Sequence, residues 1–98
     1  MKLRWTYRAR QDLKDIGRYI ARDNRDAARK WLTRLRRSAA RAAATPRAGR
    51  IVPEIGSSDV REVITGNYRL VYRIEGKTVT VLTVFEGHRL LRFPEALK

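Results

Sequence analysis

Three short segments near the end of the chain alternate in residue character and are joined by glycine-containing turns. They cover Val60–Ile64, Tyr68–Ile74 and Thr78–Phe85, with Gly66-Asn67 and Gly76-Lys77 between them. A period of two residues is typical of β-strands, and turns this short join neighbouring antiparallel strands. The pattern therefore predicts a β-meander. The almost uniformly apolar third segment is expected to lie inside the sheet, with Val79, Val81, Thr83 and Phe85 on one face.

The second predicted strand should present different side chains on its two faces. The tyrosines, Leu70 and Ile74 share one face, whereas Arg69, Val71 and Arg73 share the other. At roughly 3.3 Å rise per residue, these two arginines would stand about 13 Å apart along the strand, and each guanidinium suits a phosphate or a carboxylate. The alternative is that these arginines pair with glutamates across the sheet.

The first half of the chain has the apolar period of amphipathic helices. Two successive stripes are predicted to face the core: Ala9, Leu13, Ile16 and Ile20, and then Ala28, Trp31, Leu32, Leu35, Ala39 and Ala42. Thr6 and Asn24 are placed to cap the two helices, and Thr45-Pro46 to end the second. The two helices should form an antiparallel hairpin.

Two shorter segments complete the expected architecture. Lys2–Thr6 predicts a short N-terminal strand, and Arg50–Ile55 an edge strand or extended segment, because Pro53 cannot donate to a central ladder. The fold class is α+β: an N-terminal strand and a two-helix antiparallel hairpin packed on a three- to four-stranded, mainly antiparallel β-meander. At 98 residues, the chain is expected to form a single domain over residues 1–98.

Positive charge is concentrated in the helical half. The chain has 23 Lys and Arg against 10 Asp and Glu, and residues 1–50 alone hold 16 Lys and Arg and 4 Asp, a net charge of +12. A basic ridge on the second helix is formed by Lys30, Arg34, Arg37 and Arg41. Such a field attracts nucleic acid or an acidic protein, although a solvated arginine-rich surface is the alternative.

Composition excludes several classes of function. The chain has no cysteine and one histidine, so a thiolate or histidine-cluster metal site is not expected, and no cofactor is predicted. It also lacks an apolar leader and any apolar run of the ~20 residues that span a bilayer, which favours a cytoplasmic protein without a membrane partner.

The order of several short motifs resembles the RelE/ParE toxin superfamily. These motifs are Trp5-Thr6, Asp12-Leu13, Tyr19-Ile20, Gly49 to Glu54, Arg61-Glu62, Tyr68 to Arg73 and Gly87-His88-Arg89. The resemblance covers nearly the whole chain. It implies the toxin of a type II toxin-antitoxin pair, neutralised by a cognate antitoxin with an acidic wrapping segment, in a possible hetero-oligomer.

Two targets are implied by the superfamily. ParE-like members inhibit DNA gyrase without known hydrolytic chemistry, which is the expected function here because no tyrosine follows Arg89. RelE-like members cleave messenger RNA on the ribosome by attack of the 2′-hydroxyl on the adjacent phosphate. For the RelE-like alternative, the resemblance implies a catalytic set of Arg69, Arg89, Glu54 and His88.

The sequence leaves the contact surface and a third function open. Target-binding candidates are Arg61, Arg69, Arg73, Arg89 and Arg92, beside the basic helix surface described above. Glu54 could equally pair with a nearby arginine, and His88 could be an ordinary loop residue. The third possible function is a small nucleic-acid-binding regulator without toxicity.

Overall fold

The computed structural model describes residues 1–87, and His88, Arg89 and Arg92 lie outside this part. The elements follow the order β1 (Lys2–Trp5), α1 (Tyr7–Ala21), α2 (Arg25–Ala44), a short 3₁₀ helix η1 (Pro46–Ala48), β2 (Arg50–Ile51), β3 (Val60–Thr65), β4 (Tyr68–Glu75) and β5 (Thr78–Glu86). This is the α+β architecture predicted from the sequence.

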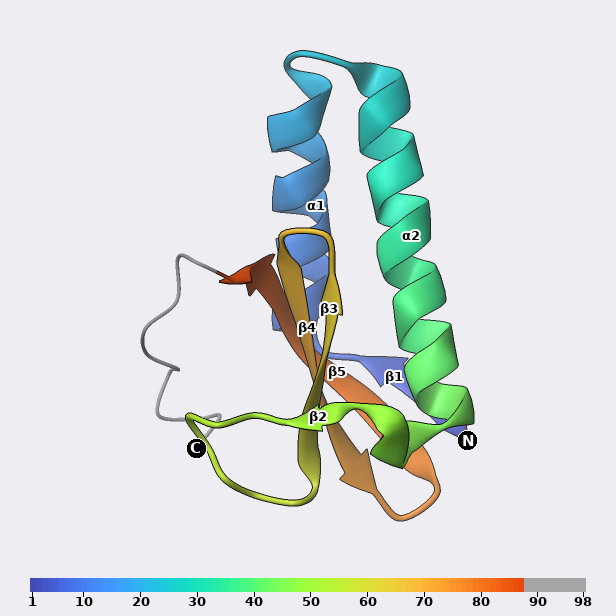
Figure 1. Cartoon of the computed structure of the whole chain (residues 1–98). Coiled ribbons are helices and arrows are strands. Elements are labelled where there is room, and N and C mark those ends of the chain that lie inside the picture. The colour runs from blue at the N-terminus through green and yellow to red at the C-terminus, as the bar shows by residue number, and fades with distance from the viewer. Residues whose placement is uncertain (88–98) are drawn as a thin grey trace.

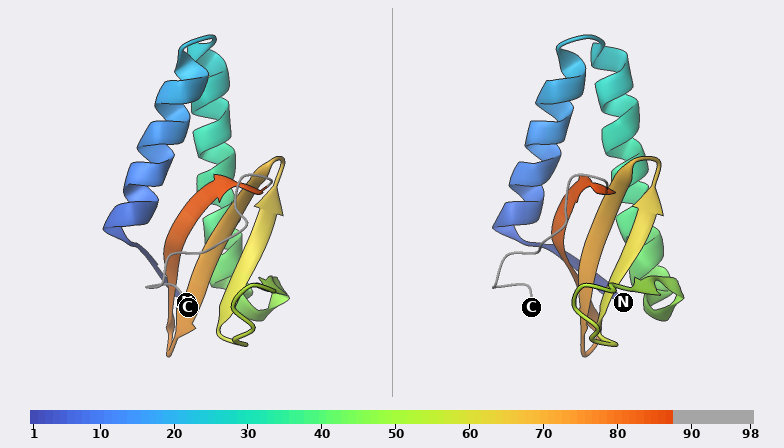
Figure 2. Two further views of the ribbon diagram at one scale, coloured as in Figure 1. Left: turned by 90° about the vertical axis from the view of Figure 1, so that its left-hand side faces the viewer. Right: turned by 60° about the vertical axis from the view of Figure 1, so that its left-hand side comes forward.

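One five-stranded sheet forms the centre of the molecule, in the order β1-β5-β4-β3-β2. β3, β4 and β5 make the predicted antiparallel meander, and β2 extends it with two antiparallel residues. β1 joins the other side as a parallel neighbour of β5, with Leu3 opposite Val79. The sheet therefore joins both ends of the described chain, and β5 lies inside it as expected (Figures 1 and 2).

Side-chain caps define where each helix begins. The Thr6 hydroxyl accepts a hydrogen bond from the Ala9 amide at the start of α1, and the Asn24 side chain accepts one from Ala27 at the start of α2. Each cap satisfies a backbone donor that the helix itself leaves unpaired. The helices form a hairpin whose turn projects beyond the sheet (Figure 1). Neither helix in residues 1–87 is both long and apolar enough to cross a membrane.

The helical hairpin covers one face of the sheet and completes the main core. Leu13 and Leu35 of the helices pack with buried Tyr68, Leu70 and Tyr72 of β4. The opposite face carries a smaller apolar cluster, in which Val71 and Leu82 pack beneath the segment between β2 and β3. The face of β4 that carries the tyrosines is therefore the helix-covered face, and the arginine face lies on the other side.

A β-bulge makes one sequence expectation wrong. Val71 pairs with Thr83 but Tyr72 pairs with Val81, so Leu82 is an extra residue on β5. After this bulge the alternation shifts: Val84 packs in the helix-side core with Val81, whereas Phe85 packs with Leu82 on the other face. Phe85 therefore does not share a face with Val79 and Val81.

Candidate functional site

A network of ion pairs lies on the sheet face opposite the helices. The Arg69 guanidinium binds the Glu54 carboxylate at two points, with Nη1–Oε2 and Nη2–Oε1 distances of 2.8 and 2.9 Å. Its Nε donates to Glu62 Oε1 at 2.5 Å, and Arg50 pairs with the other carboxylate oxygen of Glu62. The Glu62 side chain is fully buried and that of Arg69 is 10% exposed. These four residues are called the ion-pair network below.

The chain segment after β2 brings Glu54 to Arg69. Beyond Ile51 the backbone leaves the sheet and turns, with the amides of Ile55 and Gly56 both donating to the Val52 carbonyl. Val52 itself is buried against Val60 and Val71. Apolar burial therefore holds this segment over the outer face and places the Glu54 carboxylate at the guanidinium. The expected strand over 50–55 is correspondingly only two residues long.

Pairing fixes the charge states of both partners. The Arg69 hydrogen bonds hold the pKa of Glu54 below its ordinary value, against the opposing effect of burial. The hydrogen bonds that Arg69 donates to Glu54 and Glu62 raise the pKa of Arg69. Both groups are therefore charged at neutral pH, and Glu54 is a weak base while this pair is formed.

The predicted target-binding arginines do not share one location. Arg69 is in the ion-pair network, and Arg73 lies half-buried four residues further along the same strand. Arg61 instead lies opposite Tyr72 and donates to the carbonyl oxygens of Arg47, Gly49 and Ser58. It therefore supports the chain between α2 and β3, which the sequence alone did not indicate. Arg89, Arg92 and His88 fall outside residues 1–87, so their roles stay predictions.

The basic ridge on α2 lies on the surface, as expected. Arg34, Arg37 and Arg41 line a hollow of about 240 Å³ beside the β3–β4 turn at Ile64 to Gly66. The Arg34 guanidinium stacks over the Trp31 ring at 4.4 Å from its centroid. Trp31 in turn meets Tyr68 edge-on at 5.3 Å between ring centroids, so Arg34 is held by a side chain that is itself packed.

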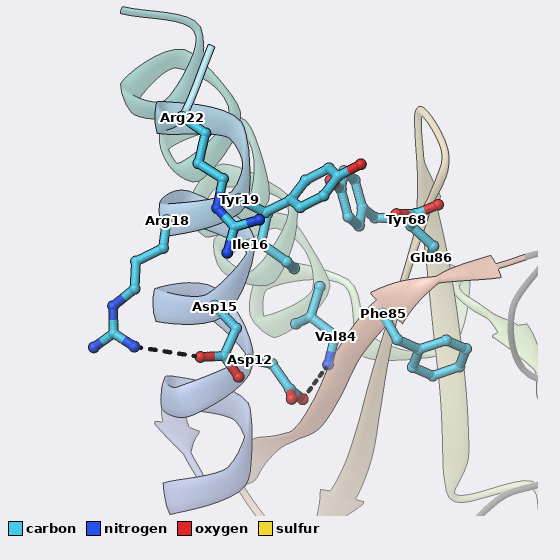
Figure 3. A pocket seen from close by; sticks show the side chains of 10 residues that line it. All are labelled: Asp12, Asp15, Ile16, Arg18, Tyr19, Arg22, Tyr68, Val84, Phe85 and Glu86. Atoms are coloured by element: carbon cyan, nitrogen blue, oxygen red, sulfur yellow. Dashed lines mark hydrogen bonds and ion pairs between the residues drawn. The ribbon is translucent and has the colours of Figure 1, made fainter. Parts of the chain in front are cut away.

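A larger groove of about 740 Å³ separates α1 from the end of β5 (Figure 3). Tyr19 of α1 and Arg22, which caps the end of α1, face Tyr68 and Glu86 across its upper part. At its lower end Asp12 accepts hydrogen bonds from the Thr83 hydroxyl and the Val84 amide, at 2.6 and 3.0 Å. No residue of this groove was among the sequence-based site candidates. The sequence feature that could have indicated this groove is Tyr19, an exposed tyrosine one helical turn before Arg22.

A second groove, of about 500 Å³, is apolar and has a basic rim. It lies between the two helices and β1, where Leu3, Trp5, Leu13 and Leu32 form the floor. Arg10, Lys14 and Arg36 stand around it. Among the described strands, β1 pairs only with β5 and therefore ends the sheet beside this groove. An apolar floor rimmed by cations suits an amphipathic segment that carries acids.

A helical hairpin on a mainly antiparallel sheet, with a strongly basic helix, is the architecture that the resemblance to the RelE/ParE toxin superfamily implied. Residues 3–91 match the family described as "ParE toxin of type II toxin-antitoxin system, parDE". The chain belongs to this ParE toxin family.

Relatives in sequence and in structure agree with this assignment. A Sinorhizobium fredii protein named "Putative toxin Y4kP" is 35% identical over 98 residues, covering 98% of this chain and 96% of that protein. The chromosomal ParDE system of P. aeruginosa has a similar fold, with a TM-score of 0.73 at 21% identity over 88% of this chain and 95% of that one. The RelBE2 toxin-antitoxin complex of Mycobacterium tuberculosis gives 0.62 at 27% identity, covering 87% and 95%.

Proposed function

We propose that this protein arrests bacterial growth by inhibiting DNA gyrase without hydrolytic chemistry. The observation that carries the proposal is the pairing of Arg69 with Glu54. A RelE-like nuclease would need Arg69 to bind the phosphate and Glu54 to act as the base. Here the two side chains are bound to each other instead. A carboxylate bound at two points to a guanidinium is a poor proton acceptor. Membership of the ParE family supports the same proposal.

The test is a pair of assays on the purified protein. We expect it to block gyrase supercoiling or to trap cleaved DNA, and to leave messenger RNA intact on programmed ribosomes. In cells, induction should trigger DNA-damage signalling together with growth arrest. Cleavage of translated messages with DNA spared would establish the RelE-like alternative instead. Expression without growth arrest would favour the non-toxic regulator.

The partner of the apolar groove is proposed to be the cognate antitoxin. ParDE and RelBE2, two systems with similar solved structures, are toxin-antitoxin systems. An acidic amphipathic segment of such a partner would place its apolar face on Trp5 and Leu13 and its carboxylates near Arg10, Lys14 and Arg36. Such a segment would cover the apolar groove and form a core shared by the toxin and the antitoxin.

Charge reversal at the rim tests this assignment. We expect Arg10→Glu, Lys14→Glu and Arg36→Glu together to weaken antitoxin capture in co-expression by at least tenfold. A matched triple variant, Arg8→Glu, Arg22→Glu and Arg25→Glu, removes the same charge from residues outside the groove and should retain capture. Equal loss in both variants would show that net charge, not this groove, determines binding.

A further inference from the structure

Within residues 1–87, a row of cations without an ion pair follows one face of α2. The acids of the ion pairs lie away from this row, with partners at Arg18, Arg29, Arg47, Arg50 and Arg69. Lys30, Arg34 and Arg37 form no ion pair with any described residue, and Arg41 donates only to the Ser38 hydroxyl and not to an acid. These four residues, the basic ridge, therefore keep their full charge for an external partner.

The ridge is also organised before any partner arrives. Arg34 is held against Trp31 by its cation–π contact, and Arg41 by its hydrogen bond to Ser38, which is buried and bonded to Thr65 of β3. Fixing these guanidinium groups in the free protein lowers the entropy that binding would otherwise cost. Arginines whose only role is to be solvated need no stacking or hydrogen-bonding contacts of this kind.

The spacing of the ridge fits a phosphate backbone. Arg34, Arg37 and Arg41 follow one another along the helix over about 10 Å, at a rise of 1.5 Å per residue. One strand of B-form DNA presents about three phosphates over the same length. The neighbouring hollow beside Thr65 and Gly66 is open to solvent and has a polar lining that leaves room for phosphate oxygens.

We propose that the basic ridge binds the phosphate backbone of duplex DNA, the substrate that the proposed target holds. The inference rests on the proposed gyrase inhibition and names the contact by which the toxin reaches the enzyme–DNA complex. Each arginine neutralises one phosphate and releases its counterion, so binding weakens steeply with salt. The ridge lies along the DNA backbone and provides no side chains that reach into a groove. It therefore does not contact base edges.

A direct binding assay tests the ridge without gyrase. Anisotropy of a short labelled DNA duplex should show binding by the wild-type protein. Arg34→Gln, Arg37→Gln and Arg41→Gln together should weaken it at least tenfold and reduce the slope of log affinity against log salt by about 2.7, since each contact contributes about 0.9. A control variant, Arg4→Gln, Arg8→Gln and Lys77→Gln, removes equal charge and should lose less than threefold. Circular dichroism and melting must show that both variants fold.

Three results would overturn the inference. The first is no binding of DNA by the wild-type protein. The second is equal weakening by the ridge and control variants, which would make the effect one of net charge. The third is tighter ridge-dependent binding of an RNA duplex or of polyglutamate than of DNA.

Supercoiling assays separate this inference from the function on which it rests. If the wild-type protein inhibits gyrase and the ridge variant inhibits equally well, the inference fails and the proposed function stands. If DNA binding depends on the ridge but gyrase is unaffected, the proposed function fails while the surface remains a DNA-binding one.

Discussion

Glu54 and Arg69 hold two parts of the outer sheet face together through a two-point ion pair. Glu54 comes from the segment after β2, its side chain is 27% exposed, and Arg69 is the second residue of β4. The same guanidinium neutralises Glu62, which has no exposed surface. Arg69 therefore neutralises a buried carboxylate and also anchors a surface segment. These contacts give this arginine a structural role in addition to any contact with a target.

Arg69→Ala is expected to destabilise the fold. It leaves Glu62 buried with Arg50 as its remaining ion-pair partner and should lower the free energy of unfolding by about 3 kcal/mol, the usual cost of breaking a buried pair. Urea denaturation followed by tryptophan fluorescence measures this loss. Arg47→Ala removes an exposed pair with Asp59 and should cost less than about 1 kcal/mol. A similar small loss for both would mean that the ion-pair network contributes little.

Acid should weaken the attachment of the segment that carries Glu54. Because the pKa of Glu54 is lowered in the folded protein from its ordinary 4.5, the unfolded chain binds a proton first as pH falls. This contribution to stability is complete above the unfolded value and is lost as pH falls through the folded one. Denaturation series from about pH 6 to about pH 3 should show that the free energy of unfolding depends less on pH in Glu54→Gln than in the wild type. Identical slopes would contradict the pairing.

Position 66 in the β3–β4 turn should tolerate no side chain. Gly66 has φ +60°, and an added Cβ would lie 2.3 Å from the Trp31 ring. Gly76 has a similar φ of +59° but open space around it. Gly76→Ala should therefore cost only backbone strain, about 1 kcal/mol, whereas Gly66→Ala should cost at least about 2 kcal/mol because Trp31 must also move. Thermal melting compares the two, and an emission shift of tryptophan reports the displacement. Equal costs would mean that the Trp31 side chain can move aside without loss of stability.

Much of the fold was predictable because it is encoded locally. The Thr6 and Asn24 caps, the glycine turns and the period-two strands each reflect interactions within a few residues. The observed bounds of β1, β3, β4 and β5 differ from the predicted ones by one residue, whereas the segment over 50–55 forms a strand only at Arg50–Ile51. The bulge at Leu82 was not predictable, because Val81, Leu82 and Val84 are equally suited to either face of a buried strand.

The candidate site was less predictable, since it depends on segments far apart in the chain. The sequence suggested that Arg69 could pair across the sheet, and Glu62 is such a cross-strand neighbour. The pairing with Glu54 instead requires the segment after β2 to fold over the outer face, which only the burial of Val52 makes evident. The basic ridge, by contrast, follows from helix periodicity alone and lies where it was expected.

Asp12 offers the last test, because it joins α1 to β5 through one carboxylate oxygen. That oxygen accepts from the Thr83 hydroxyl and from the amide of Val84, which is buried and pairs with β4 on one side of the bulge. Asp12→Ala leaves both donors without this acceptor and should lower the free energy of unfolding by about 2 kcal/mol. Asp15→Ala, one turn away, removes a side chain that is 70% exposed and pairs loosely with Arg18 at 3.8 Å. Its cost should stay below about 0.5 kcal/mol. Hydrogen exchange of the Val84 amide should quicken only in the Asp12 variant, and unchanged protection there would show that the sheet alone holds this strand.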